Sequence, residues 1–126
     1  MENLNLKYHQ DALNELSSIC RLENDKWWID LETGEKKERN KGEMLMLIVS
    51  EIAEAMEGER KGLMDDKLPH RKMAEVELAD ALIRIFDYAG EYGMDLGGAL
   101  VEKMAYNRTR KDHTHEERIK AGGKKF

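Results

Sequence analysis

Apolar residues along this chain recur three or four positions apart, and no stretch of any length alternates apolar and polar residues as a half-buried strand does. This spacing predicts an all-α protein with a four-helix bundle-like fold. The chain's single proline, Pro69, fits the same class. The main helices are expected at about Leu4–Leu22, Glu43–Arg60, Arg71–Glu91 and Asp95–Arg110.

Polar segments and glycines separate these helices. The segment from Asp30 to Gly42 is polar, with a turn signal at Thr33-Gly34, and we expect it to connect the first two helices. Gly62 marks the end of the second helix, and Asp95 is a favourable N-cap for the fourth. Within the first helix the residues expected to face inward are Leu6, Leu13, Leu16 and Cys20.

The third helix is apolar around most of its circumference, which is typical of a buried helix. Its polar residues share one stripe, formed by Glu77, Asp80, Arg84 and Asp87. Within that stripe we expect Arg84 and Asp87, three positions apart, to form a salt bridge. Three amphipathic helices of one chain can hardly cover so broad an apolar surface, so the pattern predicts a homodimer or homotetramer.

Composition supports that expectation. The chain has 126 residues, enough for one domain, but Leu, Ile, Val and Phe together number only 26. This fraction lies near the lower limit for a self-sufficient core. We therefore expect the core to be supplemented by some of the eight methionines or by a partner subunit.

Charge and cysteine content narrow the classes of function. A net charge of −5 argues against broad nucleic-acid binding. The longest apolar run, Met44 to Val49, is too short to span a bilayer, and the first residues lack a signal-peptide layout. One cysteine, Cys20, allows no internal disulfide framework. These features favour a cytoplasmic protein with neither nucleic acid nor membrane as partner.

Candidate chemistry comes from two pairs of carboxylates in the most apolar stretches. Glu51 and Glu54 lie in one predicted helix, and Glu77 and Asp80 lie in the next. A spacing of three residues places each pair on one helix face. Four acids among apolar residues repel one another and are costly to desolvate, and a hard divalent cation with oxygen ligands relieves both costs. Because Mg²⁺ usually binds together with substrate phosphates, the pattern indicates phosphate chemistry.

The alternative is that these acids lie on solvated helix faces, since a single pair of this kind is common in helical proteins. Two such pairs in neighbouring predicted helices are a more specific signal than one pair alone. The two pairs are separated by 22 residues, and helices joined by a short loop pack antiparallel, which brings the pairs face to face. We therefore favour a metal site formed by Glu51, Glu54, Glu77 and Asp80.

The segments around these acids resemble the all-α nucleotide pyrophosphohydrolases of the MazG-like superfamily. The resemblance covers roughly residues 40 to 112 and includes the stretches 47–55, 77–84 and 103–110. It implies hydrolysis of nucleoside triphosphates to monophosphate and pyrophosphate, and we expect deoxynucleoside triphosphates as the substrates. It also implies a Mg²⁺ cofactor, which Mn²⁺ can replace, and a dimer or tetramer. Glu51 and Glu54 are then the candidates to orient or deprotonate the attacking water.

Two further groups become candidates for substrate contacts. Lys103, Asn107 and Arg110 share one face of the fourth helix and suit triphosphate oxygens, although a solvated basic face is the alternative. Of the adjacent Trp27 and Trp28, we expect one to pack in the core and the other to contact a base.

The domain prediction follows from the same resemblance. We expect an all-α pyrophosphohydrolase domain over residues 1–112 and a basic C-terminal tail over residues 113–126. Residues 107–126 carry a local charge of +4, which complements phosphate, so the tail is a candidate lid over the nucleotide. Two other functions remain open: a phosphoribosyl-ATP pyrophosphohydrolase-like enzyme, and a non-catalytic helical module whose acids bind a basic partner without Mg²⁺.

Overall fold

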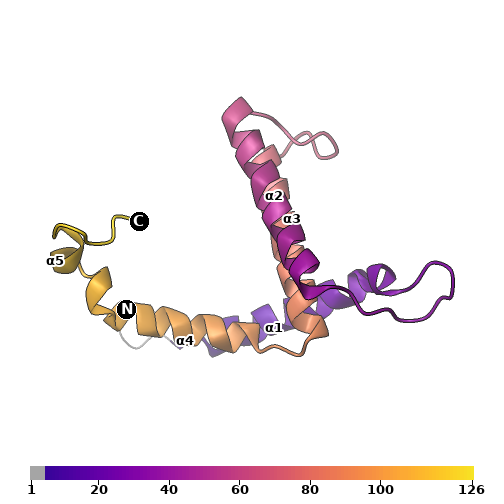
Figure 1. The fold of residues 1–126 in the computed structure, drawn as a ribbon, viewed down its shortest axis with the longest axis horizontal. Coiled ribbons are helices and arrows are strands. Elements are labelled where there is room, and N and C mark those ends of the chain that lie inside the picture. The colour runs from indigo at the N-terminus through magenta and orange to yellow at the C-terminus, as the bar shows by residue number, and fades with distance from the viewer. Residues whose placement is uncertain (1–4) are drawn as a thin grey trace. The chain divides into compact units, whose positions relative to one another are not determined.

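The computed structural model describes residues 5–126, and the expected all-α class is confirmed. The described elements are α1 (Lys7–Glu23), η1 (Asp25–Trp28), α2 (Lys41–Lys61), α3 (Met73–Glu91), α4 (Leu96–Thr109), η2 (Lys111–His113) and α5 (His115–Arg118) (Figure 1). The expected start of the first helix at Leu4 lies outside the described residues. From residue 5 onward the chain forms isolated β-bridges but no strand. No helix in this range is long and apolar enough to cross a membrane.

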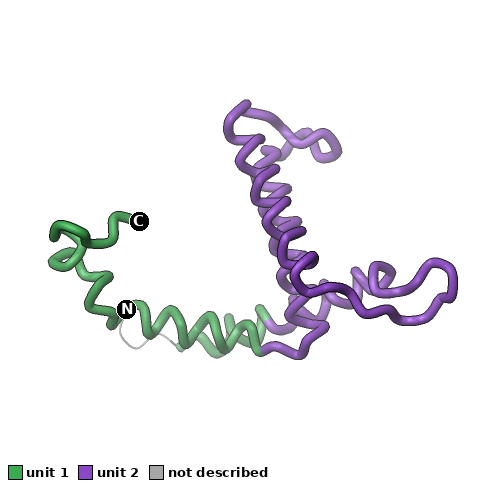
Figure 2. Tube along the Cα trace, in the orientation of Figure 1, with its two compact units in different colours: residues 1–13, 95–126 green, residues 14–94 purple. Residues whose placement is uncertain are grey.

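The chain divides into two compact units (Figure 2). Unit 1 comprises residues 1–13 and 95–126, and unit 2 comprises residues 14–94. Unit 2 contains the C-terminal part of α1, the polar connection, α2 and α3. All four candidate acids therefore lie in unit 2. The expected domain boundary at residue 112 stays a prediction.

In unit 2, α2 and α3 pack side by side as a helical hairpin (Figure 1). Asn40 caps α2, because its Oδ1 accepts a hydrogen bond from the Glu43 backbone N–H at 2.9 Å. Gly62, with φ of +62°, ends the helix in the left-handed conformation that favours glycine. Near this end the helices are close: a Cβ on Gly58 would lie 2.9 Å from the Cβ of Met73. The hairpin geometry therefore depends on a short side chain at position 58.

The connection between α2 and α3 is organised by a buried acid. Asp65 Oδ2 accepts backbone hydrogen bonds from Lys67 at 3.0 Å and Leu68 at 2.8 Å, and the Asp65 N–H donates to the Arg71 carbonyl at 2.9 Å. These bonds fix the turn that reverses the chain. As a result α3 returns along α2, which brings Arg84 into contact with Glu51, 33 positions earlier in the sequence.

The C-terminal part of α1 contacts the end of α3. Ser17 Oγ donates a hydrogen bond to the Phe86 carbonyl at 2.6 Å, and Arg21 Nε forms an ion pair with Glu91 Oε2 at 2.5 Å. Gly90 permits this contact, since a Cβ there would lie 2.8 Å from the Cβ of Arg21 and 2.9 Å from the Ser17 carbonyl oxygen.

Replacing Gly90 with Ala should therefore destabilise the protein. The added methyl group meets a helix backbone, and overpacking of this kind costs about 1–3 kcal/mol. Chemical denaturation of Gly90→Ala should show a lower midpoint with an unchanged slope. Glu59→Ala, an exposed change within a helix of the same unit, is the control and should leave the midpoint nearly unchanged. Equal stability of wild type and Gly90→Ala would contradict the close contact.

The centre of unit 2 is built around Trp28, which is 1% exposed. Its indole Nε1 donates to Asp87 Oδ1 at 3.0 Å, so the buried carboxylate of Asp87 has a partner from a segment 59 residues away. The predicted salt bridge between Arg84 and Asp87 is wrong. Arg84 Nε instead pairs with Glu51 Oε1 at 3.0 Å, because the hairpin places α2 beside this part of α3.

Two burial predictions are also wrong. Leu16, expected to face inward, is exposed, whereas Leu6, Leu13 and Cys20 are half-buried. The third helix is not buried all round: Leu78 and Leu82 are about half exposed. The physical reason is that α2 packs along one side of α3, and the opposite apolar side has no comparable helix against it in the described chain.

In unit 1, Asp95 caps α4 as its sequence position indicates, with its Oδ1 accepting from the Gly98 backbone N–H at 2.8 Å. Beyond α4 the chain forms η2 and the single-turn helix α5. The last residues fold back on α5: Arg118 Nε donates to the Lys124 carbonyl at 3.2 Å, and Lys125 Nζ donates to the Arg118 carbonyl at 2.7 Å. The basic tail thus has local structure of its own.

Candidate functional site

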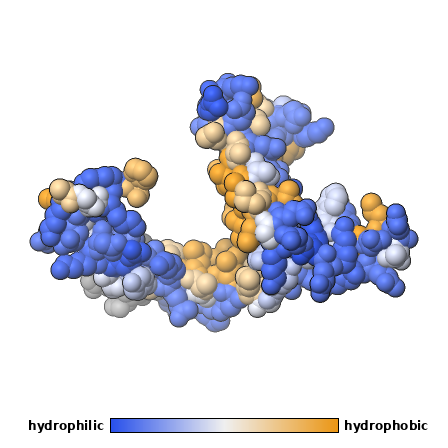
Figure 3. Space-filling view, viewed as in Figure 1, coloured by the Kyte–Doolittle hydropathy of each residue, from blue (hydrophilic) through white to orange (hydrophobic). Residues whose placement is uncertain are grey.

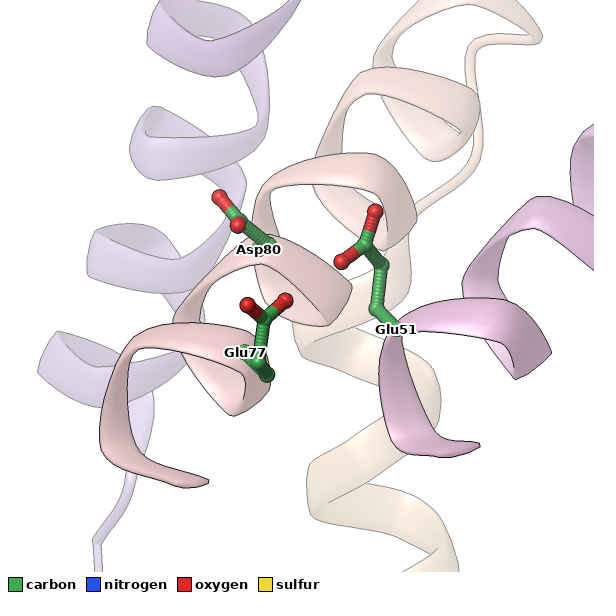
Figure 4. A group of neighbouring side chains, drawn as sticks. All are labelled: Glu51, Glu77 and Asp80. Carbon is green, nitrogen blue, oxygen red and sulfur yellow. The ribbon is translucent and has the colours of Figure 1, made fainter. Parts of the chain in front are cut away.

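Three of the four candidate acids converge in unit 2 across the α2–α3 hairpin (Figure 4). Glu51 extends from α2 toward Glu77 and Asp80, which lie one turn apart on α3. One carboxylate oxygen from each residue lies within 4.8 Å of those of the other two. All three side chains are half-buried. We call this group the acid cluster.

Glu77 is the most perturbed member of the acid cluster. Burial, followed by hydrogen bonds with Glu51 and Glu54 and by the negative charges of the same two residues, raises the pKa of Glu77 to about 8. Its Oε2 atom is buried without a hydrogen-bond partner in the described chain. A carboxyl in this state holds its proton at neutral pH, and its unpartnered oxygen is directed to a place where no protein donor reaches it.

The pKa of Asp80 is also raised, for related reasons. Burial raises its pKa, and the negative charges of Glu51, Asp65 and Glu54 act in the same sense, while Arg84 opposes them. Asp65 was not predicted as part of this environment. It lies in the connection between the helices, where no periodic pattern marks it, and only the fold of that turn brings its charge near Asp80.

Glu54 differs from the other three acids. It is exposed and is not a member of the group whose oxygens lie within 4.8 Å, although it contributes to the pKa shift of Glu77. The four-ligand set expected from the sequence is therefore brought together as three close acids with the fourth beside Glu77. A role outside the direct ligand set suits Glu54, because an exposed carboxylate retains access to water.

Arg84 is a site residue that the sequence analysis assigned to another partner. Its ion pair with Glu51 places one cation at the edge of the acid cluster. The available signal was its position four residues after Asp80, which puts both side chains on one face of α3. The arginine offsets part of the negative charge but leaves Glu77 without a cationic partner in the described chain.

A cavity of about 360 Å³ opens beside the acid cluster. Its lining comes entirely from unit 2 and consists of Asn24, Trp27, Arg39, Leu47, Glu51, Asp80, Ile83, Arg84 and Asp87. The two tryptophans separate here. Trp27 is 58% exposed and lines the cavity, whereas Trp28 is buried against Asp87. Of the two, only Trp27 offers an accessible ring to a ligand in this cavity.

The predicted phosphate-binding residues of the fourth helix lie in unit 1. Lys103 Nζ lies 4.8 Å from the centre of the Tyr106 ring, and Arg110 pairs with Asp112 at 2.7 Å. Asn107 Oδ1 is buried and has no hydrogen-bond partner in the described chain. The acid cluster belongs to unit 2, so a common role of these residues with the cluster stays a prediction.

The residues of the acid cluster fit a hard divalent cation. All the ligand atoms are carboxylate oxygens, the type that Mg²⁺ and Mn²⁺ prefer over nitrogen and sulfur donors. The unpartnered Glu77 oxygen and the raised pKa values of Glu77 and Asp80 are the expected signs of acids gathered without their counter-charge.

Comparisons of the chain with protein-family models, with curated proteins and with solved structures find no match.

Proposed function

We propose that this protein is a Mg²⁺-dependent pyrophosphohydrolase that converts a nucleoside triphosphate to the monophosphate and pyrophosphate. The observation that carries the proposal is the buried, unpartnered Glu77 oxygen within a group of three acids contributed by two helices. Solvated helix faces would not hold a carboxyl with a pKa of about 8, because water would screen its neighbours and stabilise its charge. The resemblance of the surrounding segments to the MazG-like superfamily supports the same reaction.

Each residue of the site then has a task that its position suits. Glu51, Glu77 and Asp80 would hold the cation, which when bound neutralises charge on the phosphate oxygens. Glu54, exposed beside Glu77, would orient or deprotonate the attacking water. Trp27 would stack on the base at the mouth of the cavity.

The reaction is tested by the identity of its products. Purified protein with Mg²⁺ should convert at least one deoxynucleoside triphosphate to its monophosphate with release of pyrophosphate. EDTA should stop the reaction, and Mn²⁺ should restore it. A panel of ribonucleotides, deoxyribonucleotides and phosphoribosyl-ATP, analysed by chromatography, would identify the substrate. Release of inorganic phosphate in place of pyrophosphate would mean attack at the γ-phosphorus and would contradict the proposal.

A homo-oligomer forms part of the same proposal. Leu45, Val49, Ile52 and Met56 lie at successive helical positions on α2, and each is about half exposed. Hydrophobic side chains also gather along the α2–α3 hairpin in Figure 3. A spacing of four, three and four residues is the pattern with which one helix packs on another. A second copy of this chain presents the same stripe and is the occupant that we propose.

We expect light scattering at micromolar concentration to give the mass of a dimer or tetramer. Ile52→Glu should shift the protein toward a smaller species, because it places a charge in the middle of the stripe. Glu59→Gln, an exposed change on the same helix, is the control and should leave the mass unchanged. A wild-type monomer that is folded and active would refute the assembly.

A further inference from the structure

A second cavity in unit 2, which we call the basic cavity, has a volume of about 550 Å³. It lies where the polar connection passes the C-terminal end of α3, and it is lined by Trp28, Lys36, Lys37, Glu38, Arg39, Lys41, Glu91 and Tyr92. We propose that the basic cavity is a metal-independent binding site for a small phosphate-bearing anion.

The first argument is charge. Four cationic side chains and two carboxylates line the basic cavity in a chain whose net charge is −5. One carboxylate is already neutralised, because Glu91 pairs with Arg21 at 2.5 Å and with Lys36 at 2.6 Å. Within residues 5–126, no carboxylate forms an ion pair with Lys37, Arg39 or Lys41. Lys37 and Arg39 act on the charges of Asp30 and Asp87 without pairing with them, so the cavity keeps three cations that can contact an incoming anion directly.

The second argument is that two of these cations, Arg39 and Lys41, are held against aromatic rings. Arg39 is half-buried, with its guanidinium 5.5 Å from the centre of the Trp28 ring, and Lys41 Nζ lies 4.4 Å from the centre of the Tyr92 ring. The rings form a fixed floor, since Trp28 is buried and hydrogen-bonded to Asp87. A ring face attracts a cation without neutralising it, so the positive charges are positioned and still available.

The backbone of the connection supports the same arrangement. Ile29 and Lys36 form an antiparallel bridge, and the Lys37 N–H donates to the Trp28 carbonyl at 2.9 Å. Lys41 is the first residue of α2, so the positive end of a 21-residue helix adjoins the cavity. A connection held at both ends loses little freedom when it binds, which favours affinity for a small ligand.

The ligand class follows from these groups. Lysine ammonium groups and an arginine guanidinium match the oxygens of phosphate esters and of pyrophosphate. The volume lies within the range of small-molecule sites, about 300–1,000 Å³. Because the cations converge on a concave site, a compact phosphate-bearing molecule is favoured over an extended polymer.

The basic cavity is distinct from the acid cluster. Glu91 lies eleven positions after Asp80, which corresponds to about 16 Å along α3. Arg39 lines both the basic cavity and the cavity beside the acid cluster, but Glu51 and Asp80 line only the latter. The acid cluster attracts cations and the basic cavity attracts anions, so this inference stands whether or not the proposed hydrolysis occurs.

Calorimetric titration with inorganic pyrophosphate in EDTA and low salt tests the proposal. Wild type should show saturable binding, and Lys37→Ala/Lys41→Ala should bind at least about tenfold more weakly, because the variant lacks two cationic donors for charge-assisted hydrogen bonds to phosphate. The matched control is Lys26→Ala/Lys67→Ala, which removes the same charge elsewhere in unit 2 and should retain wild-type affinity. Asp80→Asn should also bind normally.

Three results would overturn the proposal: no saturable binding to wild type, equal weakening in the two double variants, or loss of binding only in Asp80→Asn. Lys37 and Lys41 are both exposed, so the fold should survive their truncation. The single variant Lys37→Ala leaves the first turn of α2 unchanged and should show a weakening of the same sign. Normal affinity in that variant, with its fold intact by circular dichroism, would also count against the site.

Discussion

Asp80→Asn should fold with wild-type helical content and lose turnover by more than about 100-fold. Even a residue that only orients a metal ligand changes affinity or activity by about 10–100-fold, so the loss of a direct ligand should exceed that range. Asp80 is half-buried in the acid cluster, and burial together with the negative charges around it raises its pKa. A neutral amide at this position should relieve repulsion in the metal-free protein while it weakens the cation site.

Thermal unfolding with and without Mg²⁺ separates a role in the site from a role in the fold. The wild-type midpoint should rise with Mg²⁺, because a ligand that binds only the folded state stabilises it. The midpoint of Asp80→Asn should start at or above the wild-type value and should rise little. Glu59→Gln, an exposed change on α2, is the matched control for both measurements. Turnover retained by Asp80→Asn would contradict the assignment of this acid.

Thermal unfolding of Glu54→Gln with and without Mg²⁺ distinguishes a residue that acts on the attacking water from a direct metal ligand. Because Glu54 is exposed and lies outside the group of three close acids, its variant should lose turnover yet keep most of the Mg²⁺-dependent rise in the unfolding midpoint. Loss of both properties in Glu54→Gln would place this residue among the direct ligands instead.

The metal-free protein should lose stability as the pH rises from about 4.5 to about 8. The ordinary pKa of glutamate is 4.5, and Glu77 in the folded protein has a pKa of about 8. Between these values the unfolded chain has released the Glu77 proton and the folded chain still holds it. Rising pH therefore favours unfolding across this window, and the effect levels off above it. The expected total is on the order of a few kcal/mol.

Glu77→Gln should remove most of this dependence of the free energy of unfolding on pH. The glutamine amide is neutral at every pH in the window, and its N–H groups can donate to Glu51 and Glu54 as the protonated carboxyl does. The variant should therefore exceed wild type in stability at pH 8 in EDTA and match it near pH 4.5. The measurement is a series of urea unfolding curves at several pH values, with Glu59→Gln as control. If the free energy of unfolding changed with pH in the same way for wild type and Glu77→Gln, Glu77 could not be the origin of the pH dependence.

The helices were predictable because they depend on local signals. The Asp95 cap and the Gly62 end follow from residue types that satisfy helix termini, and the observed bounds lie close to those expected. The encounter of Glu51 with Glu77 and Asp80 was predictable for a similar reason. A helical hairpin with a short connection places its two acidic faces opposite each other.

Pairing across the chain was not predictable in the same way. Arg84 has Asp87 one turn away in sequence, but the hairpin offers Glu51, and the ion pair forms with Glu51. Asp87 in turn accepts from Trp28, a residue of a 3₁₀ turn far from α3 in the sequence. The partners of Arg84 and Asp87 depend on which segment of the chain lies beside α3. The periodicity of a single sequence does not contain that information.

The basic cavity illustrates the same limit. Lys36 and Lys37 lie in the connection between α1 and α2, which has the sequence of an ordinary polar loop, and Lys41 begins α2. Their convergence with Tyr92 requires the connection to fold back along the end of α3. The sequence supplies the charges, and the tertiary fold alone supplies the concavity.

The adjacent tryptophans have a spectroscopic consequence. Trp27 is open to solvent beside the acid cluster, whereas Trp28 is enclosed and hydrogen-bonded to a carboxylate. The emission of the chain therefore has two components: one accessible to a quencher dissolved in the buffer, and one shielded from it. Occupation of the neighbouring cavity would alter the first component, and loosening of unit 2 would expose the second. The two fluorophores therefore report on different places: Trp27 on the cavity beside the acid cluster, and Trp28 on the basic cavity and on the fold of unit 2.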